Sequence, residues 1–237
     1  MKKLELFLNR NCNLNCSYCT FKDNSILENK ISLDNFKQVI LEYSISEIVI
    51  LGGEPTLNKN LKDILDLKIP TTIYTNTYNI EEFLDYDIHW KCSYHNDTDL
   101  STFIKKINLL KEYNRSYQII LPINKDYSLI KYQVLSNLFK NVTVEPLLYL
   151  DNGFTEQSIE NIEYCRTLNS NIAKQDLTNI SCNKICKISD HQITYDFYRN
   201  VLYKCLTYLD SSNTSFDLIC NYNYCFCDIE YKEDYET

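Results

Sequence analysis

The segment LELFLNRNCNLNCSYC, residues 4–19, joins an apolar run to three closely spaced cysteines. The run LELFL has the length and composition of a buried β-strand. Cys12, Cys16 and Cys19 follow it with the spacing C-x3-C-x2-C. Three thiolates do not complete a tetrahedral zinc site, which takes one ligand more, but they can hold three irons of a [4Fe-4S] cluster. The remaining iron is then open to an outside ligand.

Strand-like and helical patterns alternate through the next part of the chain. The expected strands cover residues 4–8, 47–51, 71–75, 88–94, 117–123 and 142–150. The expected helices cover residues 33–43, with Ser32 as N-cap, then 59–67, 80–86, 99–113, 128–139 and a later stretch at 155–174. This alternation predicts an α/β fold with a parallel sheet and right-handed crossovers. A partial (β/α)6 barrel and a doubly wound sheet both fit, and both bind ligands at the carboxyl ends of their strands.

The chain has only three glycines, and two of them, Gly52 and Gly53, are adjacent. They follow the apolar run at 47–51 and precede Glu54 and Pro55. In a chain that otherwise avoids glycine, the pair indicates a backbone need, either positive φ or close approach of a ligand. Because the glycines and the cysteines each follow a strand of one parallel sheet, we expect both motifs at the same edge.

Composition narrows the class of protein. The 237 residues are 44% hydrophobic, enough for one medium domain or a domain with a small appendage. The net charge of −8 disfavours a nucleic-acid partner. The N-terminus MKKLELFLNRN is not a secretory signal, and no apolar run is long enough to span a membrane, so we expect a cytoplasmic protein. In a reducing compartment, 11 cysteines indicate metal ligation or redox chemistry rather than disulfides.

The two motifs together resemble a known family. CNLNCSYC after the first strand and GGEP after the second are similar to the signatures of the radical S-adenosylmethionine (SAM) superfamily, over about residues 3–150. A zinc knuckle beside a turn is the alternative. The resemblance implies a partial barrel of the radical SAM type, with a [4Fe-4S] cluster held by Cys12, Cys16 and Cys19. It also implies that SAM binds the open iron and that a flavodoxin- or ferredoxin-type donor reduces the cluster. SAM is then cleaved to methionine and a 5′-deoxyadenosyl radical, which abstracts a substrate hydrogen.

The resemblance also assigns roles around SAM. Gly52 and Gly53 would let the backbone approach the SAM amino group, Glu54 would accept a hydrogen bond from that ammonium, and Pro55 would stiffen the turn. Tyr18 resembles the aromatic residue that packs on adenine, with ordinary loop packing as the alternative. Further candidate contacts, which follow the later strands, are Thr75, Asn76, Ser93, His95 and Asn124. Among these, Ser93 would face the ribose and His95 would contact SAM or substrate unless it is simply packed. Thr77 stands where the family usually has glycine.

The C-terminal part has a different texture, with six cysteines between residues 182 and 237. It resembles the SPASM and twitch extensions of the superfamily, in which a β-hairpin carries ligands for auxiliary clusters. We expect the hairpin in residues 191–205, with the turn near Arg199-Asn200 in place of the usual glycine. One auxiliary [4Fe-4S] cluster is expected rather than two, because six thiols are too few for two clusters; structural zinc is the alternative. The favoured ligands are Cys186, Cys205, Cys225 and Cys227, with Cys182 and Cys220 as alternates.

These observations predict three units: a barrel at 1–150, a linking helical segment at 151–181 and the cysteine-rich extension at 182–237. The favoured function is a radical SAM enzyme that modifies a peptide by cross-linking, epimerisation or dehydrogenation. The alternatives are a small-molecule substrate, such as a sugar or nucleotide derivative, and a non-catalytic Fe–S or zinc protein. A glycyl-radical-activating role is disfavoured because no ferredoxin-like insert separates the cysteines from GGEP. Since the chain starts at its first strand, we expect any peptide-recognition domain to be a separate protein. Cys92 is expected to be a small buried hydrophobe rather than a hydrogen donor to a substrate radical.

Overall fold

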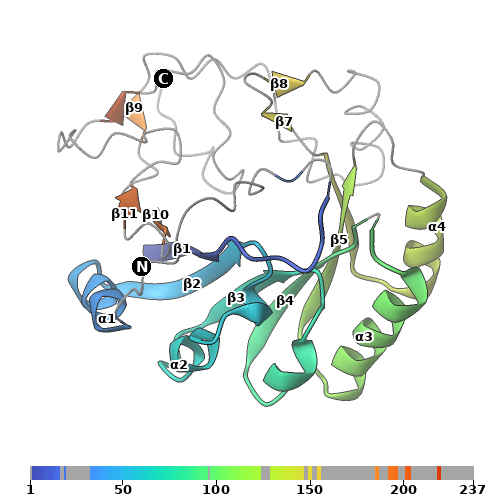
Figure 1. The fold of residues 1–237 in the computed structure, drawn as a ribbon, viewed down its shortest axis with the longest axis horizontal. Helices are drawn as coiled ribbons and strands as arrows, with labels where there is room; N and C mark the ends of the chain where they lie inside the picture. The colour runs from blue at the N-terminus through green and yellow to red at the C-terminus, as the bar shows by residue number, and fades with distance from the viewer. Residues whose placement is uncertain are drawn as a thin grey trace.

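The structure is a computed structural model that describes residues 2–16, 19, 33–95, 97–123 and 129–146, together with six short strand segments nearer the C-terminus. Its centre is a sheet in which six strands lie side by side in chain order (Figure 1). They are β1 (Lys2–Asn9), β2 (Ile45–Gly52), β3 (Thr71–Thr75), β4 (Ile88–Ser93), β5 (Tyr117–Ile123) and β6 (Val142–Pro146). Each neighbouring pair is parallel. The order never reverses, so the partial (β/α)6 barrel is confirmed over the doubly wound alternative, whose order changes at a switch point. The barrel is open, because β1 and β6 do not pair.

Helices occupy the crossovers between these strands. They are α1 (Leu33–Glu42), α2 (Leu61–Leu65), α3 (Leu100–Glu112) and α4 (Leu129–Leu138), with 3-10 turns η1 (Pro55–Leu57) and η2 (Ile80–Phe83). All four α-helices lie along the outer side of the curved sheet (Figure 1). The predicted helix at 80–86 is only the 3-10 turn η2, and the side chain of its N-cap residue, Asn79, accepts no capping hydrogen bond. By contrast, Asp99 caps α3 by accepting a hydrogen bond from the Thr102 backbone N–H at 2.8 Å.

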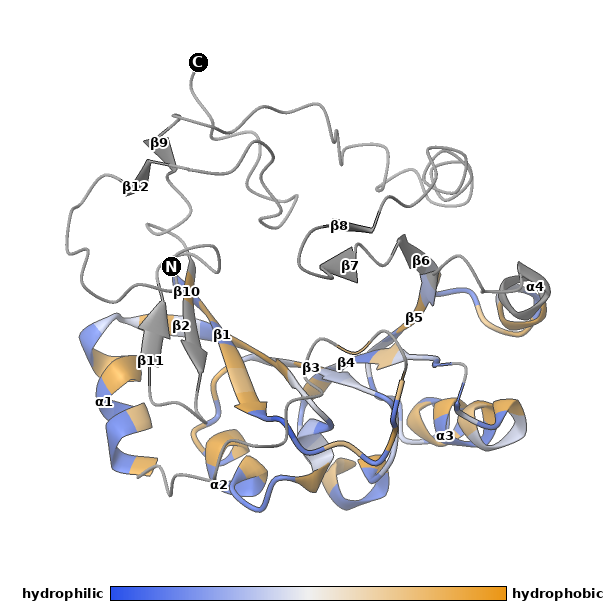
Figure 2. Cartoon of the chain, turned by 45° about the horizontal axis from the view of Figure 1, so that its top comes forward, coloured by the Kyte–Doolittle hydropathy of each residue, from blue (hydrophilic) through white to orange (hydrophobic). Residues whose placement is uncertain are grey.

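Packing divides the sheet into two faces. Alternate strand residues such as Leu4, Ile50 and Trp90 are fully buried in one core with helix residues such as Phe36 and Ile107. Figure 2 shows the matching stripes of apolar and polar residues on α1 and α3. The intervening strand residues point away from the helices, and several of them, including Glu5, Tyr74 and Lys91, are only half-buried. We call the side that they occupy the inner face.

The C-terminal hairpin is present and extends the main sheet. Its strands β10 (Gln192–Asp196) and β11 (Val201–Tyr203) are antiparallel, as predicted for residues 191–205. Beyond the prediction, β10 also pairs in parallel with the free edge of β1. This edge would otherwise present unpaired backbone groups to solvent, so the hairpin completes an eight-stranded sheet. The predicted turn residues lie outside the described part of the chain.

The remaining strands are short. The predicted strand at 142–150 is divided, because β6 ends at Pro146, which lacks the N–H that a ladder needs. Its last residues form β7 (Tyr149–Leu150), which pairs with β8 (Phe154–Thr155). Two further strands, β9 (Ile185–Cys186) and β12 (Leu218–Ile219), also pair antiparallel. The predicted helix at 155–174 falls almost wholly outside the described residues, as does Ser32, and the three-unit division of the chain stays a prediction.

Candidate functional site

The two predicted motifs meet at the carboxyl ends of β1 and β2. The backbone N–H of Gly53 donates to the Asn9 carbonyl at 2.7 Å, and the backbone N–H of Glu54 donates to the Asn11 carbonyl at the same distance. The Asn9 side-chain amide returns a hydrogen bond to the Glu54 carbonyl at 3.1 Å. The start of the cysteine loop is therefore fastened to the GGEP turn by three hydrogen bonds.

The glycine pair is required by this close approach. A Cβ on Gly52 would lie 2.4 Å from the Asn9 carbonyl oxygen, and one on Gly53 would lie 2.2 Å from that of Asn11. Gly52 also has φ of +130°, which L side chains rarely adopt. Sequence reasoning offered two reasons for the pair, positive φ or close approach of a ligand, and the φ of Gly52 bears out the first. The structure adds a third reason, because the backbone of the cysteine loop passes across both glycines.

A Gly53→Ala variant tests this contact. The added methyl group overlaps only backbone atoms of Arg10 and Asn11, which cannot rotate away as a side chain would. We expect the free energy of unfolding to fall by about 3 kcal/mol, the upper part of the range for overpacking. Urea unfolding of the cluster-free protein measures it. A variant with unchanged stability would contradict the close approach of the loop.

Glu54 is the polar centre of the junction and is fully buried. One carboxylate oxygen accepts from the hydroxyls of Thr56 and Thr75, at 2.6 and 2.7 Å, and from the Thr56 backbone N–H at 3.2 Å. The other accepts from the backbone N–H of Asn76 at 2.7 Å. Burial raises the pKa of the carboxyl on balance, and these four hydrogen bonds offset part of that rise. Because every contact is a donor, the site is built for the ionised, acceptor-only form. Glu54 thus joins the carboxyl ends of β2 and β3.

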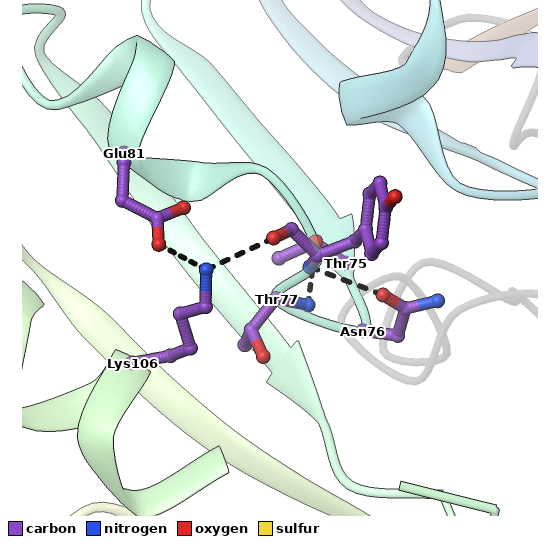
Figure 3. Close-up of polar contacts among 6 residues, drawn as sticks. Thr75, Asn76, Thr77, Glu81 and Lys106 are labelled. Atoms are coloured by element: carbon purple, nitrogen blue, oxygen red, sulfur yellow. Dashed lines mark hydrogen bonds and ion pairs between the residues drawn. The ribbon is translucent and has the colours of Figure 1, made fainter. Parts of the chain in front are cut away.

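The turn after β3 connects this centre to the cysteines. The Asn76 amide donates to the Asn13 side-chain oxygen at 2.7 Å and to the Cys12 sulfur at 3.5 Å. The Thr77 backbone N–H donates to the Thr75 hydroxyl at 2.8 Å, and the Tyr78 backbone N–H donates to the Asn76 side-chain oxygen at 3.1 Å (Figure 3). Thr77, where the family usually has glycine, is buried with φ of +72°. A β-branched residue there is strained, so the hydrogen bonds around it hold the turn in shape.

Lys106 of α3 fastens the far side of the same turn. Its ammonium donates to the Tyr78 carbonyl at 3.0 Å and pairs with Glu81 (Figure 3). Lys106→Met should lower the free energy of unfolding by about 1–2 kcal/mol, because the carbonyl loses a charged donor. The matched control Lys105→Met changes an exposed lysine of the same helix, and we expect a change within about 0.5 kcal/mol. Equal urea midpoints for the two variants would refute this role of Lys106.

The three cysteines lie at the start of this site and form no disulfide, with Cys16 buried and the other two half-buried. The Cys12 sulfur accepts a hydrogen bond from the Leu14 backbone N–H at 3.4 Å, besides that from Asn76. Burial raises the pKa of the Cys12 thiol, partly offset by the Leu14 bond; a bound metal would deprotonate it. Within the described residues, no three potential ligands are already gathered around a metal position. The donor set nevertheless fits an iron–sulfur cluster, since hydrogen bonds to the sulfurs are a usual feature of such sites.

The other predicted residues divide into three groups. Ser93 and His95 lie at and just after the end of β4 and are half-buried. Burial lowers the pKa of His95 to about 4, so its ring is neutral at pH 7. Cys92 is fully buried among the core residues, and burial raises the pKa of its thiol, as expected of an inert small side chain. Of Cys186 only the backbone is described, in β9. The residues outside the described part are Tyr18, Asn124, Cys182, Cys205, Cys220, Cys225 and Cys227.

Two residues of the junction were missed by sequence reasoning, Asn9 and Thr56. Both are buried polar side chains that fasten the GGEP turn. The signal for Asn9 was its place in the strand, where an amide follows the apolar run LELFL. A polar group at the buried end of a strand needs partners. Thr56 has no comparable signal in the sequence.

Comparison with known families identifies this arrangement. The family model of the Radical SAM superfamily matches residues 6–173. The chain belongs to the radical SAM superfamily. Membership makes it an enzyme and implies a [4Fe-4S] cluster and SAM as its cofactors. In the part of the chain that is described, no helix has the length and apolar character needed to cross a membrane.

Radical SAM relatives match over parts of the chain. A Methanocaldococcus jannaschii protein named as a glycyl-radical enzyme activating enzyme is 38% identical over 82 residues, 31% of each chain. A Methanococcus aeolicus protein named as a GTP 3′,8-cyclase is 35% identical over 69 residues, 27% of this chain and 23% of the relative. SuiB of Streptococcus suis, in its SAM-bound structure, aligns with 92% of this chain and 60% of its own, with a TM-score of 0.63 and 15% identity. At that identity the likeness concerns the fold, and the chain covers less than two thirds of each of these relatives.

Proposed function

We propose that Cys12, Cys16 and Cys19 ligate the [4Fe-4S] cluster and that the chain cleaves SAM reductively. The cluster and SAM together supply a 5′-deoxyadenosyl radical that abstracts a hydrogen atom from the substrate. The observation that carries the assignment is the junction of three strand ends, where the cysteine loop, the GGEP turn and Asn76 are held together. This edge is where parallel α/β sheets bind their ligands.

Each residue of the junction then has a task. Glu54 and Asn76 would hold the turn backbones beside the cluster, and Gly52 and Gly53 would let the backbone approach the SAM ammonium. The Glu54 carboxylate supports that contact mainly by positioning, since its oxygens already accept four hydrogen bonds. Tyr18 would pack on adenine, and Pro55 would stiffen the GGEP turn. The other candidate contacts to SAM and substrate are Thr75, Ser93, His95 and Asn124. A neutral His95 accepts or donates one hydrogen bond without adding charge.

The favoured substrate class is a peptide, which would be cross-linked, epimerised or dehydrogenated. Support comes from the fold likeness to SuiB, which covers 91% of this chain in the structure of SuiB bound to precursor peptide SuiA. A separate peptide-recognition protein is then a further partner, besides a flavodoxin- or ferredoxin-type donor in the cytoplasm. The matching segment of a GTP 3′,8-cyclase favours a small molecule as the second candidate. A segment of similar size matches the activating-enzyme relative, but that role stays disfavoured because no ferredoxin-like insert separates the cysteines from GGEP.

The C-terminal cysteines are proposed to hold one auxiliary [4Fe-4S] cluster. Of the candidate ligands Cys186, Cys205, Cys225, Cys227, Cys182 and Cys220, the first four are favoured. Support comes from the chain order, in which Cys186 lies in β9 and Cys205 follows β11 by two residues, so the hairpin β10–β11 stands between two of the favoured ligands. Metal analysis of a variant lacking Cys12, Cys16 and Cys19 tests this, since it should retain about four irons. If the variant contains zinc instead of iron, the C-terminal cysteines form a structural zinc site and not an auxiliary cluster.

The test of the enzymatic proposal is direct. Anaerobic reconstitution with iron and sulfide, followed by dithionite and SAM, should yield 5′-deoxyadenosine and methionine in equal amounts. A non-catalytic metal protein would bind iron or zinc and leave SAM intact. Supplying candidate peptides or nucleotides should raise the yield when one of them is a substrate.

A further inference from the structure

The inner face of the sheet carries a lysine to which sequence reasoning gave no role. Lys91 of β4 lies opposite Tyr74 of β3 in the parallel register. Its ammonium donates to the Tyr74 hydroxyl at 2.7 Å and lies 4.7 Å from the centre of the Tyr74 ring. Both contacts fix the ammonium in one place, because the flexible lysine stem is held at its tip.

No acidic group in the described part of the chain neutralises this ammonium. Among the residues that the structure describes, Lys62 pairs with Glu82 and Lys106 pairs with Glu81, whereas no carboxylate lies within ion-pair distance of Lys91. Lys91 is half-buried, and its ammonium is held by a neutral hydroxyl rather than by a carboxylate of the described residues. An ammonium forms its strongest hydrogen bonds with anionic oxygens. An unpaired, oriented ammonium therefore points to an anion that arrives with a ligand.

The position of Lys91 connects it to the reaction site. Tyr74 precedes Asn76 by two residues, and Asn76 touches the Cys12 sulfur. Two strand residues correspond to roughly 7 Å along the sheet. Ser93 follows Lys91 by two residues and so lies on the same face. A ligand held by Lys91 would therefore extend along the inner face toward the cysteine end of the sheet.

The neighbouring histidine does not compete for the anion. His89 lies two residues before Lys91, and its ring nitrogen is 2.7 Å from the Ser116 hydroxyl. Burial and the charge of Lys91 lower the pKa of His89. At neutral pH the ring is uncharged, so Lys91 is the cation of this stretch of β4. A single cation beside a neutral histidine orients a ligand that has one anionic group.

We propose that Lys91, with the Tyr74 hydroxyl beside it, binds an oxyanion of the substrate, either a carboxylate or a phosphate, and orients it on the inner face. This inference rests on the proposed radical SAM function, since it names the group by which that enzyme would hold its substrate. An ammonium binds either oxyanion through charge-assisted hydrogen bonds. Peptide glutamate and nucleotide phosphate are the two sources that an experiment must separate.

Equilibrium binding to the reconstituted, anaerobic protein tests the proposal with four probes. GTP and guanosine form one pair, and a glutamate-containing peptide amide and its glutamine counterpart form the other. We expect one anionic probe to bind better than its neutral counterpart, and the pair in which this occurs identifies the source. Lys91→Met should weaken that binding by about tenfold or more, the effect of losing a charge-assisted bond. Lys91→Arg should retain most of it, and the exposed control Lys105→Met should bind as the wild type does.

Two results would overturn the proposal. One is that neither anionic probe binds better than its neutral counterpart, and the other is that Lys91→Met and Lys105→Met bind the probes equally. Substrate-free cleavage of SAM by the same preparations separates this inference from the proposed function. Wild-type protein that forms 5′-deoxyadenosine but shows no Lys91-dependent binding would refute only the oxyanion site. Wild-type protein that forms none would refute the proposed function, whatever the binding result.

Discussion

Cys16→Ala protein should form no 5′-deoxyadenosine above the level of an enzyme-free control. The two remaining thiolates, Cys12 and Cys19, leave two irons of the cluster without protein ligands, so the cluster is held poorly. Iron content should fall by about four atoms per chain relative to the wild type, while iron held by the C-terminal cysteines stays. Product analysis and metal counting on the same preparation measure both effects.

The matched control is Cys92→Ala, which removes a cysteine from the buried side of β4. Cys92 is fully buried, and burial raises the pKa of its thiol, so it offers no thiolate to iron. We expect this variant to keep its iron and its SAM cleavage and to lose about 1 kcal/mol of stability from the small cavity. SAM cleavage by the Cys16→Ala protein would refute the ligand assignment. Equal loss of iron in both variants would show that cysteine removal acts through folding.

The six barrel strands were predictable because parallel strands covered by helices appear as short apolar runs. Segment ends were less predictable, since they depend on local chemistry. Pro146 ends β6 within the predicted strand, and β2 begins at Ile45, before the apolar run that marked it. The pairing of β10 with β1 was not predictable, because the sequence of neither segment indicates which strand it pairs with, and the two lie nearly 190 residues apart.

The candidate site was also predictable in its general location but not in its individual contacts. Topology alone brings residues after β1, β2 and β3 to one edge, so the meeting of the cysteine loop with GGEP was expected. The particular atoms that come into contact could not be predicted from the topology. Gly53 faces the backbone of Asn11, and Lys91 has no acidic partner among the residues that the structure describes. Both facts depend on distances across the sheet that residue spacing does not determine.

Glu54→Gln should destabilise the protein before any SAM is added, which distinguishes support of the fold from contact with SAM. Four donors converge on the Glu54 carboxylate, from Thr56, Thr75 and Asn76. The amide of glutamine replaces one acceptor oxygen by a donor, so at least one buried N–H or O–H faces another donor. We expect the free energy of unfolding to fall by about 2–4 kcal/mol, the cost of losing a charged acceptor and leaving a buried donor unpaired. Urea unfolding of the cluster-free protein measures this loss.

Two further variants make the result specific. Glu82→Gln alters an exposed carboxylate whose ion pair with Lys62 spans 3.5 Å, and we expect a change within about 0.5 kcal/mol. Thr56→Val removes a single hydroxyl donor to Glu54 and should cost about 1–2 kcal/mol. A Glu54→Gln protein as stable as the wild type, yet defective in SAM binding, would contradict the structural role and would reserve the carboxylate for the SAM ammonium. The expected order of stability, with Glu54→Gln lowest, instead makes Glu54 the residue that holds the ends of β2 and β3 in register beside the cysteines.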